Sequence, residues 1–215
     1  MNEHSFRKGK TLVRPREGDK RRRIIDAAVH VFSERGFFNS RVNDVADAAG
    51  VAGGTIYLYF KNKDDLLISV FEDRMDTILA VLKTELNKEK TPSGKLRRFI
   101  ELHLELVQRD RALADVLAVE LRQSAKFVRE YRARKFYEYL GVAEDILKDG
   151  ISDGTFRPTI DPKLYRRALF GALDELTVMW LACAREGRDE PCPFDDAVNQ
   201  VFNLFVFGLG PKAKL

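Results

Sequence analysis

Apolar residues recur every three or four positions along most of the chain, which is the period of an amphipathic α-helix. The first such run is predicted to begin with Asp19 as its N-cap and to end at Gly36. A short second helix is expected after Ser40, with Gly50 allowing a sharp turn, and a third covers Gly54 to Phe60. No strand-like alternation of useful length occurs, so the pattern predicts an all-α fold.

The remainder of the chain also predicts helices, about nine in total. A long helix opens at Asn62 or Asp64 and extends to Leu86. Further helices are expected over residues 95–109, 112–123, 125–150, 161–186 and 194–209. The last of them is apolar around most of its circumference, so it has two faces to bury. One face is expected to pack on its own subunit and the other on a second copy of the chain.

The positive charge of the chain is concentrated at its N-terminal end. The formal net charge is +4, but residues 1–23 hold nine basic and three acidic residues, a net charge of +6, which leaves −2 for the rest. This asymmetry favours contact of the N-terminal end with a polyanion. Residues 1–18 lack an apolar period, and we interpret them as a flexible basic arm.

Several classes of protein are disfavoured. No run of about 18 apolar residues is present to cross a bilayer, and no secretory signal pattern is visible, so we expect a cytoplasmic protein without membrane contact. Cys183 and Cys192 are too few for a zinc site or a disulfide framework. The histidines are scattered, and no nucleophile–base pair or phosphate loop is present, so we expect neither an enzyme nor a cofactor or metal site.

The stretch from Ser40 to Lys63 reads SRVNDVADAAGVAGGTIYLYFKNK and predicts a helix-turn-helix. Its second helix would enter the DNA major groove, with hydroxyl groups bonding phosphate oxygens and Tyr57 also able to touch a base edge or thymine methyl. Glycines at the helix start allow close approach to a phosphate. The DNA-binding candidates are Arg41, Asn43, Gly54, Thr55, Tyr57, Tyr59, Lys61 and Lys63.

The segment GTIYLYFKNKDDLL, preceded by DVADAAGV, resembles the DNA-binding domain of the TetR family of transcriptional regulators. The resemblance implies DNA contacts by Thr55, Tyr57, Tyr59 and Lys63. It also implies a homodimer that reads a near-palindromic, double-stranded operator. Many members have threonine near Arg41-Val42-Asn43, and here Ser40 is expected to cap the second helix instead. The domains expected are the arm 1–18, the helix-turn-helix domain 19–64 and a ligand-binding and dimerisation domain 65–215.

The C-terminal part holds the stretches ELRQS and FGALDE, which together with LYFKNKDDLLISVF resemble the FadR-type, fatty-acid-metabolism branch of that family. The resemblance implies a repressor that long-chain acyl-CoA releases from DNA. A tunnel between apolar helices could hold the acyl chain, with cations for the CoA head at its mouth. The alternative is a repressor that senses a drug or other hydrophobic small molecule, for which isolated carboxylates such as Asp174 and Glu175 would suit.

Candidate residues for the ligand and for the dimer follow from the same stretches. Arg122 and Glu120 can instead form a buried ion pair with Asp174 or Glu175, and His103 can be a core histidine. The small residues at 171 and 172 permit close helix packing. The ligand-binding candidates are His103, Val107, Leu121, Arg122, Gln123, Arg129, Phe170 and Asp174, and the dimer-interface candidates are Gly171, Phe202 and Phe205.

Overall fold

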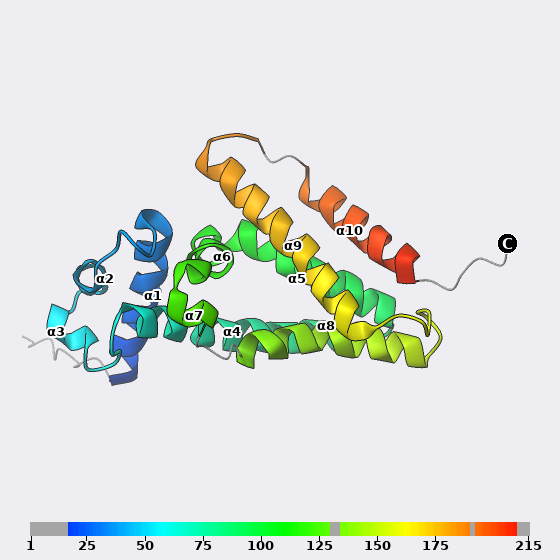
Figure 1. Cartoon of the computed structure of the whole chain (residues 1–215), viewed down its shortest axis with the longest axis horizontal. Coiled ribbons are helices and arrows are strands. Elements are labelled where there is room, and N and C mark those ends of the chain that lie inside the picture. Colours follow the sequence, from blue (N-terminus) through cyan, green and yellow to red (C-terminus); the bar gives the residue numbers. More distant parts are fainter. Residues whose placement is uncertain (1–16, 130–133, 190–191, 210–215) are drawn as a thin grey trace, which may run out of the picture.

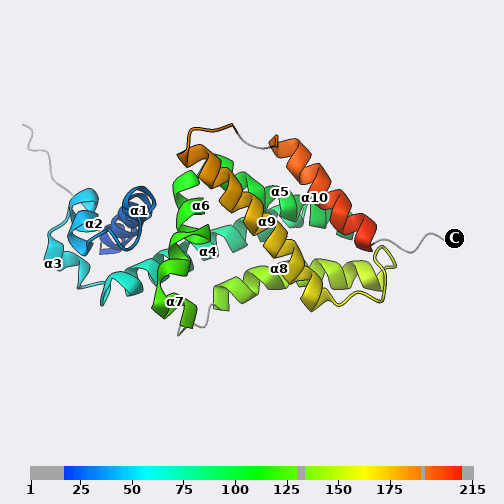
Figure 2. The same cartoon turned by 45° about the horizontal axis from the view of Figure 1, so that its top comes forward.

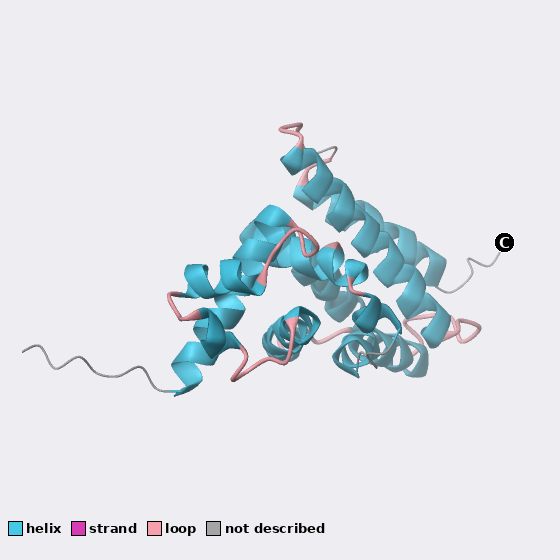
Figure 3. Ribbon diagram, turned by 60° about the vertical axis from the view of Figure 1, so that its left-hand side comes forward, coloured by secondary structure: helices cyan, strands magenta, loops and turns pink. Residues whose placement is uncertain are grey.

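The computed structural model describes residues 17–129, 134–189 and 192–209. Within these ranges the chain forms ten α-helices and one 3₁₀ helix, and no strand (Figures 1 and 3). The predicted all-α class is confirmed, with one α-helix more than the roughly nine expected. No helix of the described ranges is long and apolar enough to cross a membrane.

The helices fall into a head and a body joined by one long helix. The head consists of α1 (Glu17–Arg35), α2 (Val42–Ala49) and α3 (Gly53–Ile56), and α4 (Lys63–Leu86) leads from it into the body. The body contains α5 (Pro92–Arg109), α6 (Arg111–Ala118), the 3₁₀ helix η1 (Glu120–Gln123), α7 (Ala125–Arg129), α8 (Arg134–Ser152), α9 (Pro162–Arg185) and α10 (Phe194–Leu209).

The head occupies one end of an elongated molecule (Figures 1 and 2). Helix α9 runs from the distal end of the body back towards the head, and α10 lies beside it, away from the head. Helix α4 extends from the head along the body, where it packs against α5 and α8. Within the body, α6 and η1 lie nearest the head, because α6 packs against α1 of the head on one side and α9 on the other. Helix α10 packs on α5 and α9.

One continuous apolar core supports both parts. In the head, Ile24, Ile25 and Phe32 of α1 are fully buried. In the body, Phe99 and Trp180 are among the largest buried side chains. Both groups belong to the same cluster of buried residues, so the head and the body are packed as one unit.

Local signals mark most helix ends as predicted. Asn62 is the N-cap of α4, and its side chain accepts the Asp65 amide hydrogen at 2.8 Å. Gly36 and Gly50 take the left-handed conformation, with φ of 78° and 63°, where other residues are strained. At Gly36 the amide nitrogen donates to the Phe32 carbonyl at 3.0 Å, which closes α1.

Several predicted boundaries differ from the structure. The third helix, expected over Gly54 to Phe60, is the shorter α3 (Gly53–Ile56), so Tyr57 and Tyr59 lie in the turn after it, and α5 begins at Pro92 rather than at residue 95. Helix α1 already contains Glu17, so Asp19 lies inside it rather than at its N-cap. Ser40 does not cap α2, because its hydroxyl donates to the carbonyls of Gly36 at 2.6 Å and Val31 at 3.3 Å. Arg41 is the N-cap residue, and its amide nitrogen donates to Asp44 Oδ2 at 2.7 Å. The predicted helices 112–123 and 125–150 are each divided, into α6 and η1 and into α7 and α8.

Candidate nucleic-acid interface and ligand cavity

Helices α2 and α3 form a helix-turn-helix around Gly50. The turn is closed because the amide nitrogen of Val51 donates to the Ala46 carbonyl at 3.0 Å. Val45, Ala46 and Ile56 are buried where the two helices meet α1. A Cβ at Gly53 would lie 2.7 Å from Oδ1 of the exposed Asn43 side chain, so a larger residue there would have to push that side chain aside. The geometry predicted from the sequence is therefore present.

Arg23, from the basic run at the start of the chain, stabilises the turn rather than standing free. Its guanidinium donates to the carbonyl of Ala49 and, at 3.3 Å, to that of Gly50. These are carbonyls at the C-terminal end of α2, where a cation also meets the negative end of the helix dipole. No local pattern marks Arg23 for this role, because its two partner carbonyls are 26 and 27 residues away.

The outward face of α3 and the turn after it carries large exposed side chains. Tyr57 is 58% exposed and Leu58 is 82% exposed, which are high values for residues of this size. Gly54 is exposed too, and a side chain there would meet nothing within 4 Å. Tyr59 is only partly exposed, because its ring packs beside Phe60 at 6.3 Å between centroids. Tyr57 is thus better placed than Tyr59 to touch another molecule.

The two lysines that follow α3 differ in their surroundings. The ammonium group of Lys63 donates to the carbonyls of Phe37 at 2.6 Å, Ser40 at 2.9 Å and Phe38 at 3.3 Å. It also lies 4.5 Å from the centre of the Phe37 ring. Lys61, in contrast, is exposed. Lys63 therefore already holds the loop between α1 and α2, and its contact with phosphate stays a prediction.

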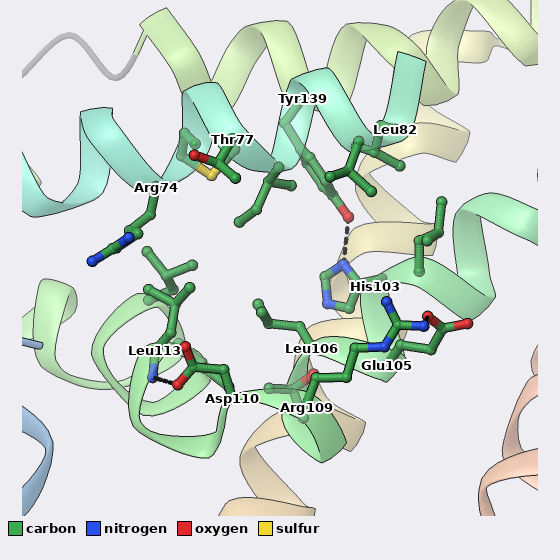
Figure 4. A pocket seen from close by; sticks show the side chains of 18 of the residues that line it. Arg74, Thr77, Leu82, His103, Glu105, Leu106, Arg109, Asp110, Leu113 and Tyr139 are labelled. Carbon is green, nitrogen blue, oxygen red and sulfur yellow. Dashed lines mark hydrogen bonds and ion pairs between the residues drawn. The ribbon is translucent and has the colours of Figure 1, made fainter. Parts of the chain in front are cut away.

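The body contains a cavity of about 380 Å³ between α4, α5, α6, α8 and α9 (Figure 4). Most of its wall is apolar, and the figure shows Leu82, Leu106 and Leu113 around the open space. The lining residues are Phe71, Arg74, Met75, Thr77, Ile78, Val81, Leu82, Leu102, His103, Glu105, Leu106, Arg109, Asp110, Leu113, Ala114, Leu117, Ala118, Phe136, Tyr139, Phe170, Asp174 and Thr177. Such a cavity suits a mainly apolar ligand.

A hydrogen-bonded pair interrupts the apolar wall. His103 Nδ1 lies 2.5 Å from the Tyr139 hydroxyl oxygen, as Figure 4 shows. Burial lowers the pKa of His103 to about 4, so the imidazole is neutral at pH 7. Burial, reinforced by the negative charge of Asp174, raises the pKa of Tyr139 above its ordinary value. The pair is therefore an uncharged, polar part of the wall that can offer a hydrogen bond.

The charged residues of the wall are mostly paired. Asp174 Oδ2 accepts from Arg122 Nη2 at 2.6 Å, as predicted, but the pair is not buried, because the Arg122 side chain is half exposed. Glu120 instead accepts from the Phe37 amide. Glu105 accepts from Arg98 at 2.8 Å and lies 2.6 Å from Arg109. The Arg109 side chain is 69% exposed, so it lies where the cavity meets solvent.

The ligand-binding candidates are only partly brought together. His103, Phe170 and Asp174 line the cavity, whereas the fully packed Val107 and Leu121 do not. Gln123 lines a second, polar hollow between head and body instead. Arg122 reaches the wall through Asp174, and the Arg129 side chain lies outside the described part of the structure.

The ligand-binding candidates predicted from the sequence include none of the cavity-lining residues of α4 and α6. Arg74, Thr77 and Ile78 of α4 lie on it, and so do Leu113 and Leu117 of α6. These residues follow the helical period like any core residue, so no local signal separates a cavity wall from a filled core.

The dimer-interface candidates lie on α9 and α10. Gly171 is exposed, and a side chain there would meet nothing within 4 Å. Phe202 and Phe205 are half-buried, Phe202 under the Arg97 guanidinium at 5.4 Å and Phe205 edge-on to Tyr165 at 6.2 Å. The same helices carry the exposed side chains Leu164 (66%), Leu204 (69%) and Phe207 (81%). An exposed apolar surface of this kind suits contact with another protein surface.

Two families match the chain in consecutive segments. Residues 24–70 match the family described as "Bacterial regulatory proteins, tetR family". Residues 71–208 match the family described as "YsiA-like protein, C-terminal region". The first segment coincides with α1 to α3 and the start of α4, and the second with the cavity-bearing body and its junction with α4.

Individual relatives agree with this division. The chain is 37% identical, over 88% of its length and 95% of the relative's, to the "Fatty acid metabolism regulator protein" of Bacillus subtilis. It resembles the solved structure of FadR from Bacillus subtilis in complex with stearoyl-CoA, with a TM-score of 0.79, 36% identity and coverage of 87% and 98% of the two chains. FadR from Bacillus halodurans gives a TM-score of 0.81 at 34% identity, with coverage of 91% and 98%.

Proposed function

Because the chain belongs to the TetR family of bacterial regulatory proteins, we propose that it represses fatty-acid-metabolism genes and leaves its operator when long-chain acyl-CoA binds. The protein acts as a homodimer in the bacterial cytoplasm and carries out no catalysis. The observation that carries the effector class is the apolar cavity, which lies in the same fold as the FadR structure solved with stearoyl-CoA.

The DNA-binding role rests on the exposed face of α3. The hydroxyl groups of Thr55 and Tyr57 donate to phosphate oxygens. The apolar edge of the Tyr57 ring also touches a base or a thymine methyl in the major groove. Gly54 allows the start of α3 to approach a phosphate. Arg41, Asn43 and Lys61 flank this face, and Tyr59 contributes from its partly exposed position.

Tyr57→Ala tests this role. The side chain is more than half exposed, so its loss should leave the melting temperature unchanged and weaken operator binding at least fivefold. The operator is first selected from random duplexes with the unsubstituted protein, and affinities are measured by fluorescence anisotropy. Tyr137→Ala on α8, where the side chain is 53% exposed, is the matched control. Equal operator affinity in both variants would remove the recognition face from the proposal.

The effector role rests on the shape and chemistry of the cavity. The acyl chain lies along the apolar wall, and the acidic head of CoA extends past Arg109, which lies at the solvent edge. His103 and Tyr139 offer a hydrogen bond to the thioester carbonyl of the ligand, within an otherwise apolar cavity wall. Asp174 of α9 lines the same wall, and Arg122 of η1 is bonded to it.

Thermal unfolding tests the effector class. Acyl-CoA thioesters of 8 to 20 carbons are added to the protein, and the longer ones should raise the melting temperature and release operator DNA. A short-chain free acid should do neither. Leu106→Trp, which places a larger side chain in the cavity, should reduce the shift, whereas Tyr137→Trp on the surface of α8 should retain it. Absence of a shift with every thioester would refute the acyl-CoA assignment while leaving DNA binding intact.

The homodimer is formed by α9 and α10 of each chain. Their exposed apolar side chains and the bare surface at Gly171 favour a four-helix contact related by a twofold axis. Two recognition faces related by that axis fit half-sites of a palindrome about 34–36 Å apart. A small change in their separation is therefore enough to weaken binding.

A second candidate is a repressor that senses a cationic, hydrophobic drug. The observation in favour of it is the mainly apolar wall with the three carboxylates of Glu105, Asp110 and Asp174. A cation would have to replace the arginines that pair with Glu105 and Asp174 or the Leu113 amide that Asp110 caps. The same melting assay separates the two candidates. A shift with hydrophobic cations and none with acyl-CoA thioesters would select the drug sensor.

A further inference from the structure

The 3₁₀ helix η1 lies between the cavity and the head, and its side chains reach in both directions. We propose that η1 transmits effector binding to the DNA-binding head, with Arg122 linked to the cavity wall and Glu120 acting as the positioning residue that holds the head. This inference rests on the proposed function, since it needs both an effector in the cavity and DNA at the head.

Arg122 joins η1 to the wall of the cavity. Its guanidinium bonds Asp174 of α9 at 2.6 Å, and it also donates to the Ala118 carbonyl at the end of α6. Asp174 itself lines the cavity. A ligand that displaces or repels the Asp174 carboxylate therefore acts directly on the side chain that fixes η1.

Glu120 joins η1 to the head. Its Oε2 accepts a hydrogen bond from the backbone amide of Phe37 at 2.5 Å, and both residues are almost fully buried, at 2% and 3% exposure. A buried carboxylate without its donor is costly, because it has lost its water. Glu120 and Phe37 are thus expected to move together rather than separate.

Phe37 is in turn connected to the recognition helix. Its carbonyl accepts from Lys63, the first residue of α4, which follows the recognition segment by only a few residues. Lys63 also bonds the carbonyl of Ser40, just before α2. A movement of the Phe37 backbone would therefore also move Lys63, which follows the α3–α4 turn, and through Lys63 the backbone at Ser40, just before α2.

A second bond links the same region to α4. The Ser124 hydroxyl, directly after η1, donates to Asp64 Oδ1 at 2.6 Å, and Ser124 is 1% exposed. Asp64 lies in the first turn of α4. One buried and one partly buried hydrogen bond from this short segment thus hold the loop after α1 and the start of α4.

The rest of this junction is partly packed and partly open. Helix α1 packs against α6, and beside that contact lies a polar hollow of about 510 Å³. Glu120 and Gln123 of η1 line the hollow together with the end of α1, the loop after it and the end of α9. The bonds of η1 therefore act together with the α1–α6 contact to position the head.

The test measures the operator dissociation constant with and without saturating stearoyl-CoA in the full-length protein. The ratio of the two constants is the coupling, for which about 5- to 150-fold is typical of allosteric proteins. Four variants are compared: Glu120→Ala, Glu120→Gln, Arg122→Gln and, as a matched control, Glu175→Gln, whose exposed side chain lies next to Asp174 on α9.

We expect Glu120→Ala to bind stearoyl-CoA and operator separately but to show a ratio below twofold. Glu120→Gln keeps an oxygen acceptor for the Phe37 amide and should keep a ratio above fivefold, as should Glu175→Gln. Arg122→Gln should also fall below twofold. The double variant Glu120→Ala/Arg122→Gln should be no worse than either single variant, because the two residues act in series.

The possible failures are distinct. An unchanged ratio in both Glu120→Ala and Arg122→Gln would overturn the inference while the proposed function stands. A ratio of one in the unsubstituted protein would refute the proposed function, and the inference with it. Should Glu120→Ala fail to fold, Arg122→Gln decides alone, since its side chain is half exposed and its loss leaves no fully buried charge unpaired.

Discussion

Lys61 and Lys63 are two residues apart and look equivalent in the sequence, yet they have different roles in the folded head. Lys63 bonds three backbone carbonyls, whereas Lys61 is exposed. The sequence-based assignment of Lys63 to a phosphate overlooked these carbonyls, because they belong to a loop 23 to 26 residues earlier.

Alanine substitutions should separate the two lysines. Lys63→Ala removes charge-assisted hydrogen bonds and should lower the free energy of unfolding by about 2 kcal/mol. Lys61→Ala should change it by less than about 0.5 kcal/mol. Lys61→Ala should instead reduce the salt dependence of operator binding by about one unit of slope. Urea unfolding and titrations between about 50 and 200 mM salt measure both effects. Equal stability of the two variants would contradict this division.

His103 makes stability depend on pH. Burial lowers its pKa from 6.5 to about 4, so the unfolded chain binds this proton more readily than the folded protein. The stability contributed by the neutral imidazole is complete above about pH 6.5 and is lost as the pH falls towards 4.

The unfolding free energy should therefore fall by about 2 kcal/mol between pH 7.5 and pH 5 on account of this group. His103→Asn should flatten that dependence, and His30→Asn, at an exposed position on α1, should leave it as it is. Urea unfolding at the two pH values is the measurement. A slope that persists in His103→Asn would assign it to other groups.

At the scale of the helix, periodicity predicted most elements, and tertiary contacts decided the remaining boundaries. Asn62 and Gly50 carry their own local signals, and both are found where expected. The break after Ala118 carries none. It turns Glu120 towards the Phe37 amide, 83 residues earlier in the chain, and no pattern within the helix encodes that partner. A cavity between the body helices was expected, and His103, Phe170 and Asp174 line it, but its wall residues on α4 and α6 were missed, because a cavity wall and a filled core share one period.

Helix α10 offers a prediction about assembly. The Phe207 side chain on this helix is 81% exposed in the single chain, so a large apolar ring faces solvent. If α10 forms the proposed dimer contact, Phe207→Glu should give a monomer, as measured by sedimentation, because a charge buried in an apolar contact is costly. Leu58→Glu, at an equally exposed position on the recognition face, should leave the dimer intact. A dimer that persists in Phe207→Glu would place the interface elsewhere.

At the scale of the whole molecule, charge is distributed unevenly. The first 16 residues carry five basic and one acidic side chain, and they precede α1 of the head. A protein beginning at Glu17 retains the buried residues of α1, so it should unfold at the same temperature.

Its operator affinity should fall and depend less steeply on salt, since fewer phosphates are neutralised. Titrations at several salt concentrations, with the unsubstituted protein alongside, test this. An identical slope would mean that the first 16 residues stay away from the duplex.

Helix α4 crosses the boundary that the sequence placed between residues 64 and 65. Its first turns bury Leu66, Leu67 and Val70 in the core shared with α1, while its later turns border the cavity at Met75 and Ile78. A chimeric regulator that takes its DNA-binding head from this protein must therefore also include the first turns of α4. The splice point for such a graft lies within a helix and not in a loop, and the incoming sensor must continue that helix in phase.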